Sequence, residues 1–501
     1  MGAPPSPGSQ RGEALLILLL CLCAALRVWL FAAAFPFFGN VDEAGHFDVV
    51  VRYSLGRVPR SLERMSPEAT HFLARYASPE YLRPPEGYPG GKYPRPFWKL
   101  PPVAAHETVR TSEAAWSAIP NHEASQAPLY YALAGAWMRA GGLLGLRGAR
   151  LLYWVRFLNV FLIAGVVLTS CVAARSILPE RRAVRLGVPL LVAFLPQDAF
   201  YVIQNDALSP LCFGVAFVFL TRWLQPGVPG SAAAAIAGGA IAATALTKST
   251  NLPLVGVALV VLAGCAWRSA ASGTLRSALP KLAVFALSAG IPIAAWMAWN
   301  ASVFGDPTGA APKIRGLGWT LKPLAAWGEH PLFTWRGLST FWSELAASFW
   351  RGELVWRGAR SASAPLDVFY ASSSAVLVGL GLASLASRQA TPPLLRRTLG
   401  LAFLCFASLV ALLATSSIAF DFGRCFYPSR EHPYFSSGRL MSGALIPFLL
   451  LYVRGLDWSV GRKGNGWPPL LLLAGLALWI TLSELAVARS VFASEYNWFH
   501  S

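Results

Sequence analysis

Clusters of acidic, basic and histidine side chains occur at five places in a chain that is otherwise apolar. Such side chains can accept a proton, hold a metal ion or bind an anion, and they are expensive to place at membrane depth, so they mark function by default. The candidate residues are Asp42, Glu43 and His46; His122, Glu123 and Gln126; Asn205 and Asp206; Lys248; and Arg439.

Asp42 and Glu43 follow directly on an apolar run from Ala14 to Phe35 that is long enough to cross a bilayer. The next residues, Ala44 to Leu55, have the apolar spacing of a short helix. Asp42 could therefore cap this helix by accepting a backbone N–H. It could equally be a catalytic carboxylate held at the membrane surface, and spacing alone leaves both roles open.

The other clusters have structural alternatives as well. Lys248 and Arg439 could extend to lipid phosphates as anchors, and Asp206 could cap the helix that follows it. Five such clusters at the same ends of the apolar runs are more than anchoring requires. We therefore expect Asp42 and Asp206 to approach one cavity, walled by a large polar loop and open sideways to lipid.

The composition indicates a polytopic membrane protein. Of the 501 residues, 55% are hydrophobic and only 13% are charged. The formal net charge of +18 would suggest nucleic acid in a soluble protein, but here the basic residues collect in short loops between apolar runs. The expected counter-charge is therefore the acidic headgroups of a lipid bilayer, and no nucleic-acid partner is expected.

Apolar runs predict an all-α polytopic fold with about eleven transmembrane helices, in a single domain over residues 1–501. The runs are 14–35, 150–174, 187–203, 207–223, 231–247, 251–267, 281–300, 366–387, 398–419, 441–455 and 468–487. Four loops rich in arginine and lysine predict the cytoplasmic side, which places the N-terminus inside. Their basic residues are Arg175, Arg181, Arg182 and Arg185; Arg268, Arg276 and Lys281; Arg388, Arg396 and Arg397; and Arg454, Arg462 and Lys463.

This orientation puts two long segments outside: a first extracytoplasmic loop, 36–126, and a Trp-rich loop, 301–365. Residues 127–144 are apolar but short, and counting them as a crossing would move the arginines of 175–185 outside. We expect an interfacial helix there. With this topology all seven histidines, His500 included, lie outside, as do all acids except Glu13, Glu180 and Asp457, so the chemistry is expected outside.

Five short motifs resemble those of the GT-C superfamily of integral-membrane glycosyltransferases, which use polyprenyl-phosphate-linked sugars. They are Asp42-Glu43-x-x-His46-Phe47, Gln126-Ala127-Pro128-Leu129-Tyr130-Tyr131, Asn205-Asp206-Ala207-Leu208, Leu246-Thr247-Lys248 and Gly438-Arg439-Leu440. A bacterial branch with an Asp-Glu-x-x-His motif is more narrowly similar; its usual forms are Pro-Asp-Glu-Pro-x-His and Gly-Arg-Tyr. This chain has Val41 and Ala44 in place of the prolines and Leu440 in place of the tyrosine.

The resemblance implies a hexosyl- or pentosyltransferase of the bacterial inner (plasma) membrane, with its site facing outside. It would move a sugar from a polyprenyl-phosphate donor to a glycan, lipid or protein acceptor. A sugar phosphate already has a good leaving group, so one base suffices.

We expect Asp42 to be that base, with Glu43 as its alternate or orienting partner. Lys248 and Arg439 would offset charge on the leaving phosphate. Substrate contacts are expected from His46, His122, Glu123, Gln126, Asn205 and Asp206.

No cofactor is implied with certainty. A divalent cation stays open, because carboxylate and imidazole groups suit magnesium, manganese or zinc. Its candidate ligands are Asp42, His46, His122, Glu123 and Asp206.

The main alternative is a transporter or flippase for a lipid-linked or polar substrate. Such a conduit needs polar residues at mid-depth, whereas the cytoplasmic halves of these runs carry almost no ionisable residue beyond the loop arginines and lysines. A non-catalytic scaffold would not need clustered aspartate, lysine and arginine. The sugar, the acceptor and the stereochemical outcome are not encoded in any pattern of the sequence.

Overall fold

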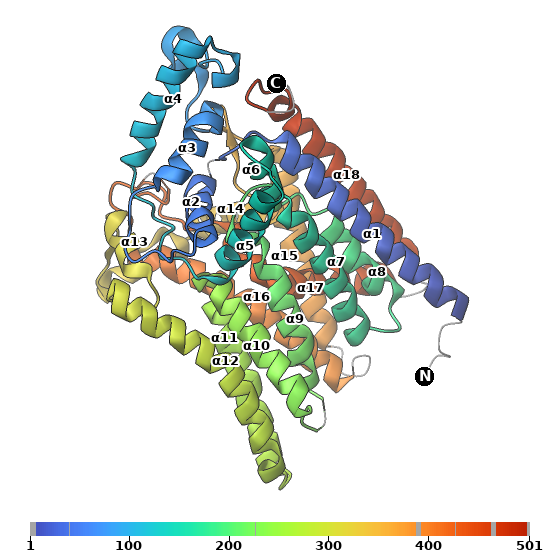
Figure 1. Ribbon diagram of the computed structural model, residues 1–501. Helices are drawn as coiled ribbons and strands as arrows, with labels where there is room; N and C mark the ends of the chain where they lie inside the picture. Colours follow the sequence, from blue (N-terminus) through green and yellow to red (C-terminus); the bar gives the residue numbers. More distant parts are fainter. Residues whose placement is uncertain are drawn as a thin grey trace.

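The computed structural model describes residues 7–39, 41–225, 227–386, 392–425, 427–461 and 467–497. Helices account for nearly all the regular structure of these residues (Figure 1). The α-helices are α1 (Pro7–Ala34), α2 (Glu43–Ser54), α3 (Pro67–Tyr76), α4 (Pro102–Ser117), α5 (Leu129–Leu143), α6 (Ala149–Arg156), α7 (Leu158–Ile177), α8 (Arg182–Ala193), α9 (Ser209–Trp223), α10 (Ser231–Thr247), α11 (Leu252–Ala271), α12 (Leu275–Phe304), α13 (Ala310–Gly316), α14 (Trp335–Arg351), α15 (Ala364–Ala386), α16 (Pro393–Ala419), α17 (Leu445–Val460) and α18 (Trp467–Phe492).

Short elements connect these helices. The 3₁₀ helices are η1 (Pro79–Tyr81), η2 (Pro85–Gly87), η3 (Pro89–Gly91), η4 (Phe97–Lys99), η5 (Asp198–Phe200), η6 (Asn205–Ala207), η7 (Ser249–Asn251), η8 (Leu324–Glu329), η9 (Pro331–Phe333) and η10 (Gly438–Ala444). Two antiparallel pairs of two-residue strands join β1 (Thr320–Leu321) to β4 (Phe420–Asp421) and β2 (Val355–Trp356) to β3 (Ala359–Arg360).

The prediction of an all-α polytopic membrane protein is confirmed. Over the described ranges, nine helical segments are long and apolar enough to cross a membrane. They are Arg11–Ala34, Ala149–Ile177, Asn205–Trp223, Ser249–Ala271, Leu275–Phe304, Ala364–Ala386, Pro393–Ala419, Gly438–Val460 and Trp467–Phe492. A tenth predicted span, 231–247, is the shorter apolar helix α10.

The predicted span 187–203 is only partly helical. Helix α8 ends at Ala193, and the chain then runs without regular structure to Gln204 apart from η5. Pro196 explains the early end, because the residue before a proline is disfavoured in the helical conformation and a proline lacks the N–H that the helix would need. The irregular segment carries Asp198 and leads into Asn205 and Asp206.

Ion pairs join several ends of the predicted cytoplasmic side. Glu13 of α1 contacts Arg175 and Arg185, on either side of the α7–α8 loop. Arg181 of the same loop lies 3.9 Å from Asp457 of α17. Arg268 and Arg397 both donate to backbone carbonyls at the end of α9. Four residues used in the topology prediction lie outside the described residues: Arg388, Arg462, Lys463 and His500.

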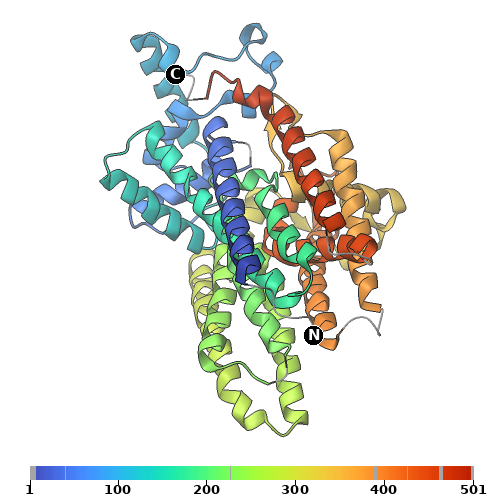
Figure 2. The same ribbon diagram turned by 90° about the vertical axis from the view of Figure 1, so that its right-hand side faces the viewer.

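Helices α2 to α6 gather at the opposite end of the bundle, and α10 to α12 extend furthest from them (Figures 1 and 2). The predicted short helix after Asp42 is α2, which packs against α5. At the contact, a Cβ on Gly135 would lie 2.8 Å from the backbone nitrogen of Ser54, so only glycine allows this approach. Helix α5 has 15 residues, which is short for a membrane span, and its interfacial position stays a prediction.

The first and last long helices lie side by side in both views (Figures 1 and 2). Arg27 of α1 pairs with Glu484 of α18 at 2.5 Å, and the Tyr201 hydroxyl donates to the same carboxylate. Further along, the rings of Phe31 and Phe492 pack edge to face. The two ends of the sequence therefore form one edge of the bundle.

The end of α1 is fixed by one buried ion pair. The fully buried guanidinium of Arg156 donates to both carboxylate oxygens of Glu43, at 2.8 and 2.7 Å. Its remaining N–H groups donate to the backbone carbonyls of Ala32, Phe35 and Pro36. This arginine therefore joins the last turn of α1 to the first turn of α2.

Replacing Glu43 with glutamine tests this role. Glu43→Gln keeps the size of the side chain but leaves the Arg156 charge buried without a counter-ion. Removing one partner of a buried pair costs about 3–5 kcal/mol, so we expect a large fall in apparent melting temperature in detergent. The control is Glu86→Gln, which removes the same charge from an exposed position of the first loop. Equal melting temperatures for the two variants would contradict the assignment.

Candidate functional site

Seven of the ten predicted site residues line one cavity of about 500 Å³, here called the main cavity. Its walls come from the start of α2, the segment before α5, the α10–α11 turn, α13 and η10. The seven residues are Asp42, His46, His122, Glu123, Gln126, Lys248 and Arg439. Tertiary structure thus brings together clusters that lie up to 397 residues apart in the sequence.

Asp42 faces the main cavity and does not cap α2. Its backbone is left-handed, with φ of 65°, and its side chain makes no capping hydrogen bond. The carboxylate instead accepts a hydrogen bond from Arg439 Nη2 at 2.7 Å, and about half of the side chain is exposed. Burial raises the pKa of Asp42, but the Arg439 and Lys313 charges outweigh this effect and hold the pKa below its usual value. The capping alternative is therefore wrong.

Glu43 points away from the main cavity. Besides Arg156, its two carboxylate oxygens accept the backbone N–H groups of Gly39 and Ile203 at 2.9 and 3.0 Å. A carboxylate has about four acceptor positions, and all four are occupied here. These bonds favour the predicted role of orienting partner, in which Glu43 holds the chain on which Asp42 stands, over that of alternate base, and both roles stay predictions.

Lys248 is buried in the turn between α10 and α11 and forms an ion pair with Asp206. Its ammonium group lies 2.7 Å from both oxygens of that carboxylate. Burial lowers the pKa of Lys248, and the Asp206 charge only partly offsets the shift. The alternative in which Lys248 extends to lipid headgroups is wrong, because the side chain is bonded inside the protein.

Asn205 and Asp206 do not line the main cavity but lie directly behind it. The Asn205 amide donates to the Gln126 side-chain oxygen at 3.3 Å and to the Thr247 carbonyl at 3.2 Å. Asp206 also approaches Arg439, at 3.9 Å. Both residues therefore support groups that reach the main cavity.

A second lysine, Lys313 of α13, completes the cationic side of the main cavity. Its ammonium group pairs with the buried carboxylate of Glu123. Burial raises the pKa of Glu123, but Lys313 and the other cations outweigh it, so the pKa lies well below its usual value. No motif marks Lys313; its one sequence signal is its place in a polar segment of the Trp-rich loop.

The two histidines of the main cavity differ in their surroundings. His46 is buried, and its Nδ1 shares a hydrogen bond of 2.7 Å with the hydroxyl of Tyr131. Burial lowers the pKa of His46 to about 4, so its ring is neutral at physiological pH. His122 packs against Gly316, and its Nδ1 is buried without a hydrogen-bond partner.

A third carboxylate at the site, Glu353, was missed by the sequence analysis. Its Oε2 lies 3.2 Å from Arg439 Nε, and Arg439 also bonds to Asp42 through Nη2. Glu353 stands in the link between α14 and β2, where no motif or apolar pattern draws attention to it. Only the contact with Arg439 reveals it.

A second polar cavity, of about 540 Å³, adjoins the main cavity across this cluster of charges. Asp42, Glu353 and Arg439 line both cavities. On the far wall of the second cavity, Glu344 accepts hydrogen bonds from His432 Nε2 at 2.8 Å and from the Ser436 hydroxyl at 2.7 Å. These three charged residues, together with Cys425 and Tyr427, thus stand between two spaces that could hold two different molecules.

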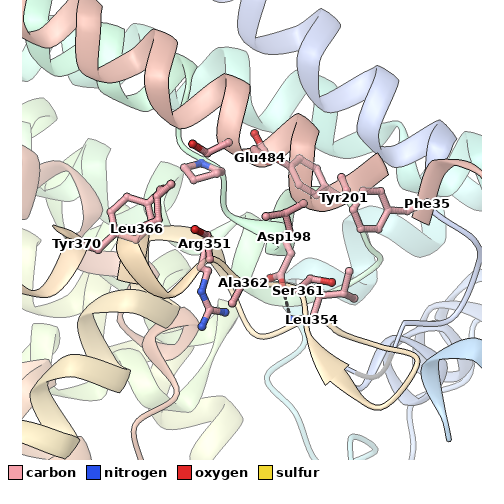
Figure 3. Close-up of a pocket in the computed structure, with 15 residues that line it drawn as sticks. Phe35, Asp198, Tyr201, Arg351, Leu354, Ser361, Ala362, Leu366, Tyr370 and Glu484 are labelled. Carbon is pink, nitrogen blue, oxygen red and sulfur yellow. Dashed lines mark hydrogen bonds between the residues drawn. The ribbon is translucent and has the colours of Figure 1, made fainter. Parts of the chain in front are cut away.

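Asp198 supports Glu353 from behind. One of its carboxylate oxygens accepts the backbone N–H groups of Glu353 and Leu354, each at 2.7 Å. Figure 3 shows Asp198 at the centre of a third, small cavity of about 60 Å³. The link that carries Glu353 is therefore held on the side away from the main cavity.

The divalent cation left open by the sequence has no preformed group of ligands. Within the described ranges, no three histidine, cysteine, aspartate or glutamate side chains are placed to hold a metal ion together. Most of the carboxylates at the site contact lysine or arginine instead.

A family model described as "Predicted membrane protein (DUF2142)" matches residues 26–422. The chain belongs to this family. No curated protein sequence matches the chain significantly.

Among solved structures, the fold is similar to ArnT from Cupriavidus metallidurans in the apo state, with 13% identity and a TM-score of 0.43, over 96% of this chain and 74% of ArnT. ArnT bound to undecaprenyl phosphate matches with 12% identity and a TM-score of 0.42, over the same shares. The archaeal oligosaccharyltransferase AglB from Archaeoglobus fulgidus, in complex with an inhibitory peptide and a dolichol-phosphate, matches with 12% identity and a TM-score of 0.41, over 97% of this chain and 56% of AglB.

The buried pair of Lys248 and Asp206 can be tested by a double-mutant cycle. Lys248→Met removes the nearer of the two cations beside the fully buried Asp206 charge and leaves Arg439 at 3.9 Å, whereas adding Asp206→Asn removes that charge too. We expect the double variant to melt at a higher temperature than Lys248→Met alone, with a coupling of roughly 0.5–3 kcal/mol. Additive effects of the two changes would show that the pair does not form.

Proposed function

We propose that the chain is a membrane glycosyltransferase that moves a sugar from a polyprenyl-phosphate donor to an acceptor hydroxyl. One observation carries this proposal: a half-exposed carboxylate, Asp42, stands in a cavity whose cations are Lys248, Lys313 and Arg439. A carboxylate can take a proton, and three cations converging on one space fit a phosphate group. A general base beside a phosphate site is what this transfer requires.

The reaction balances with these groups alone. The acceptor oxygen attacks the anomeric carbon of the sugar and forms the new C–O bond. The bond between that carbon and the phosphate oxygen breaks, and its electron pair stays on the phosphate. Asp42 takes the proton of the acceptor hydroxyl and later returns it to water. The cations stabilise the negative charge that grows on the leaving phosphate.

A lipid-linked donor also fits the surroundings of the main cavity. Its wall includes Leu317 and Leu440, and a small apolar cavity between α10, α11 and α12 adjoins it at Ser249 and Thr308. That apolar cavity is lined by Leu246, Leu252, Ile293, Trp296 and Met297. A prenyl chain could leave the main cavity along this path while its phosphate stays beside the lysines.

The transporter alternative finds weaker support. The ion pair of Arg27 and Glu484 does lie inside spanning helices, but both residues are about 10 Å from the ends at Ala34 and Phe492. The pair is closed by Tyr201, which bonds to both side chains. It is therefore placed to join α1 to α18 and not to line a path toward the cytoplasmic end.

We expect Asp42→Asn to lower the transfer rate by roughly 10²–10⁴, the contribution of a positioned general base. Asparagine has a similar size but no proton affinity, and donor binding should survive because the base contacts the acceptor. The assay uses the purified protein with a panel of polyprenyl-phosphate sugars. The control is Asp421→Asn, which removes a partly exposed carboxylate paired with Arg430. Near-normal turnover of Asp42→Asn would remove Asp42 from the reaction.

We also propose that the main cavity faces the outside of the bacterial inner membrane. A single cysteine replacing exposed Glu86 in the first loop should then react with an impermeant maleimide in intact spheroplasts. A cysteine replacing exposed Glu180, in the α7–α8 loop, should react only after the membrane is opened. Labelling of the second variant in sealed spheroplasts would reverse the orientation.

A further inference from the structure

Arg439 contacts both of the carboxylates that line the two large cavities at once, Asp42 and Glu353. Its Nη2 donates to Asp42 at 2.7 Å, and its Nη1 donates to the side-chain oxygen of Gln204 at 3.0 Å and to the Val41 carbonyl at 3.1 Å. Its Nε lies 3.2 Å from Glu353 Oε2. The guanidinium is nearly buried, so these groups and the cavity itself account for its surroundings.

The contact with Glu353 is incomplete. Arg439 Nε and Glu353 Oε1 are both buried, and neither has a hydrogen-bond partner. An unpaired buried polar group costs free energy, most of all when it belongs to a charged side chain. The two unpaired atoms belong to side chains already in contact, so Glu353 has an acceptor position left for the guanidinium. A rotation that turned the guanidinium further toward Glu353 would draw Nη2 away from Asp42.

In this arrangement Asp42 is a poor base, because the Arg439 charge stabilises its unprotonated form. A base that must take a proton from a hydroxyl works best when it is released from such a partner. An incoming phosphate changes the sum of the charges around Asp42. Before it arrives, the cluster holds three cations and four carboxylates: Lys248, Lys313 and Arg439, with Asp42, Glu123, Asp206 and Glu353. Another anion beside this cluster raises the proton affinity of any carboxylate that is free to respond.

We propose that Glu353 is a positioning residue which takes over Arg439 from Asp42 when a phosphate enters the main cavity, so that Asp42 is released to accept the proton of the acceptor. The inference rests on the proposed function, because it assigns an order to donor binding and base release. It also gives the incomplete Arg439–Glu353 contact a role. Transfer would then not begin before the donor is in place.

The link that carries Glu353 is built to hold its position during this exchange. Asp198, drawn beside Leu354 in Figure 3, accepts the backbone N–H groups of Glu353 and Leu354. Gly352, with φ of 88°, lies so close that a Cβ there would be 2.0 Å from the Asp198 carboxylate. Only side-chain torsions of Arg439 and Glu353 therefore need to change.

A pH–rate profile distinguishes this role from a structural one. In Glu353→Gln, Arg439 stays on Asp42, so kcat should fall about 10- to 100-fold while the donor KM is unchanged or lower. The acid limb of the kcat profile should move to lower pH, because Asp42 keeps the partner that depresses its pKa. Other groups facing Asp42 are the same in both proteins: Glu123, Lys313, His46 and Lys248.

The matched control is Glu344→Gln. Glu344 lines the adjoining cavity with a similar exposure, but it pairs with His432 and not with Arg439. The acid limb of the kcat profile of Glu344→Gln should lie at the same pH as that of the wild-type protein. A rate loss in Glu353→Gln without any shift of the limb would overturn the proposal. A loss of 10²–10⁴ in Glu353→Gln, with normal turnover of Asp42→Asn, would make Glu353 the base and overturn it as well.

Binding of undecaprenyl phosphate, which carries no sugar, tests the exchange without turnover. Calorimetry in buffers of different ionisation enthalpy counts the protons taken up on binding. At pH about 4 to 5, where a released aspartate titrates, the wild-type protein should take up more protons than either Asp42→Asn or Glu353→Gln. Equal uptake by all three would overturn the inference. If the wild-type protein shows this uptake but transfers no sugar, the proposed function fails while the exchange stands.

Discussion

The ion pair between Glu43 and Arg156 determines where the first long helix ends and where the main cavity begins. Arg156 bonds to three backbone carbonyls at the end of α1 and to both oxygens of Glu43. Because adjacent residues at this turn point in different directions, fixing Glu43 toward Arg156 leaves Asp42 directed toward Arg439. Both partners of a buried pair of this kind are needed, since losing either one leaves an uncompensated buried ion.

Around Asp42 the site is a network in which each cation already has a carboxylate partner. Lys248 is held by Asp206 and Lys313 by Glu123, while Arg439 lies between Asp42 and Glu353. Such a network places a charge of opposite sign beside each of these groups at the membrane surface. It also means that a phosphate entering the main cavity must compete with carboxylates, so its binding and the protonation of the site are coupled.

Much of the fold could be predicted, because apolar runs of spanning length leave few structures other than helices. The prediction of a complete spanning helix at 187–203 is wrong for a local reason, because Pro196 ends α8 early. The order of apolar runs also predicted that the charged clusters lie at the same ends of the spanning helices. Seven of the ten candidate site residues line the main cavity. The sequence could not tell Asp42 from Glu43, because Glu43 is directed by an arginine 113 residues away and Asp42 by one 397 residues away. Lys313 and Glu353 could not be found, because their role depends on tertiary contacts that no local pattern records.

A structure of the full chain in lipid nanodiscs with bound undecaprenyl phosphate would test the central claim most directly. The account predicts the phosphate in the main cavity, within hydrogen-bonding distance of Lys248, Lys313 or Arg439, with the Arg439 guanidinium bonded to Glu353 and the Asp42 carboxylate free. It also predicts the prenyl chain leaving between α10 and α12. A phosphate bound elsewhere on the protein, or an Asp42–Arg439 pair that stays closed beside a bound phosphate, would contradict it.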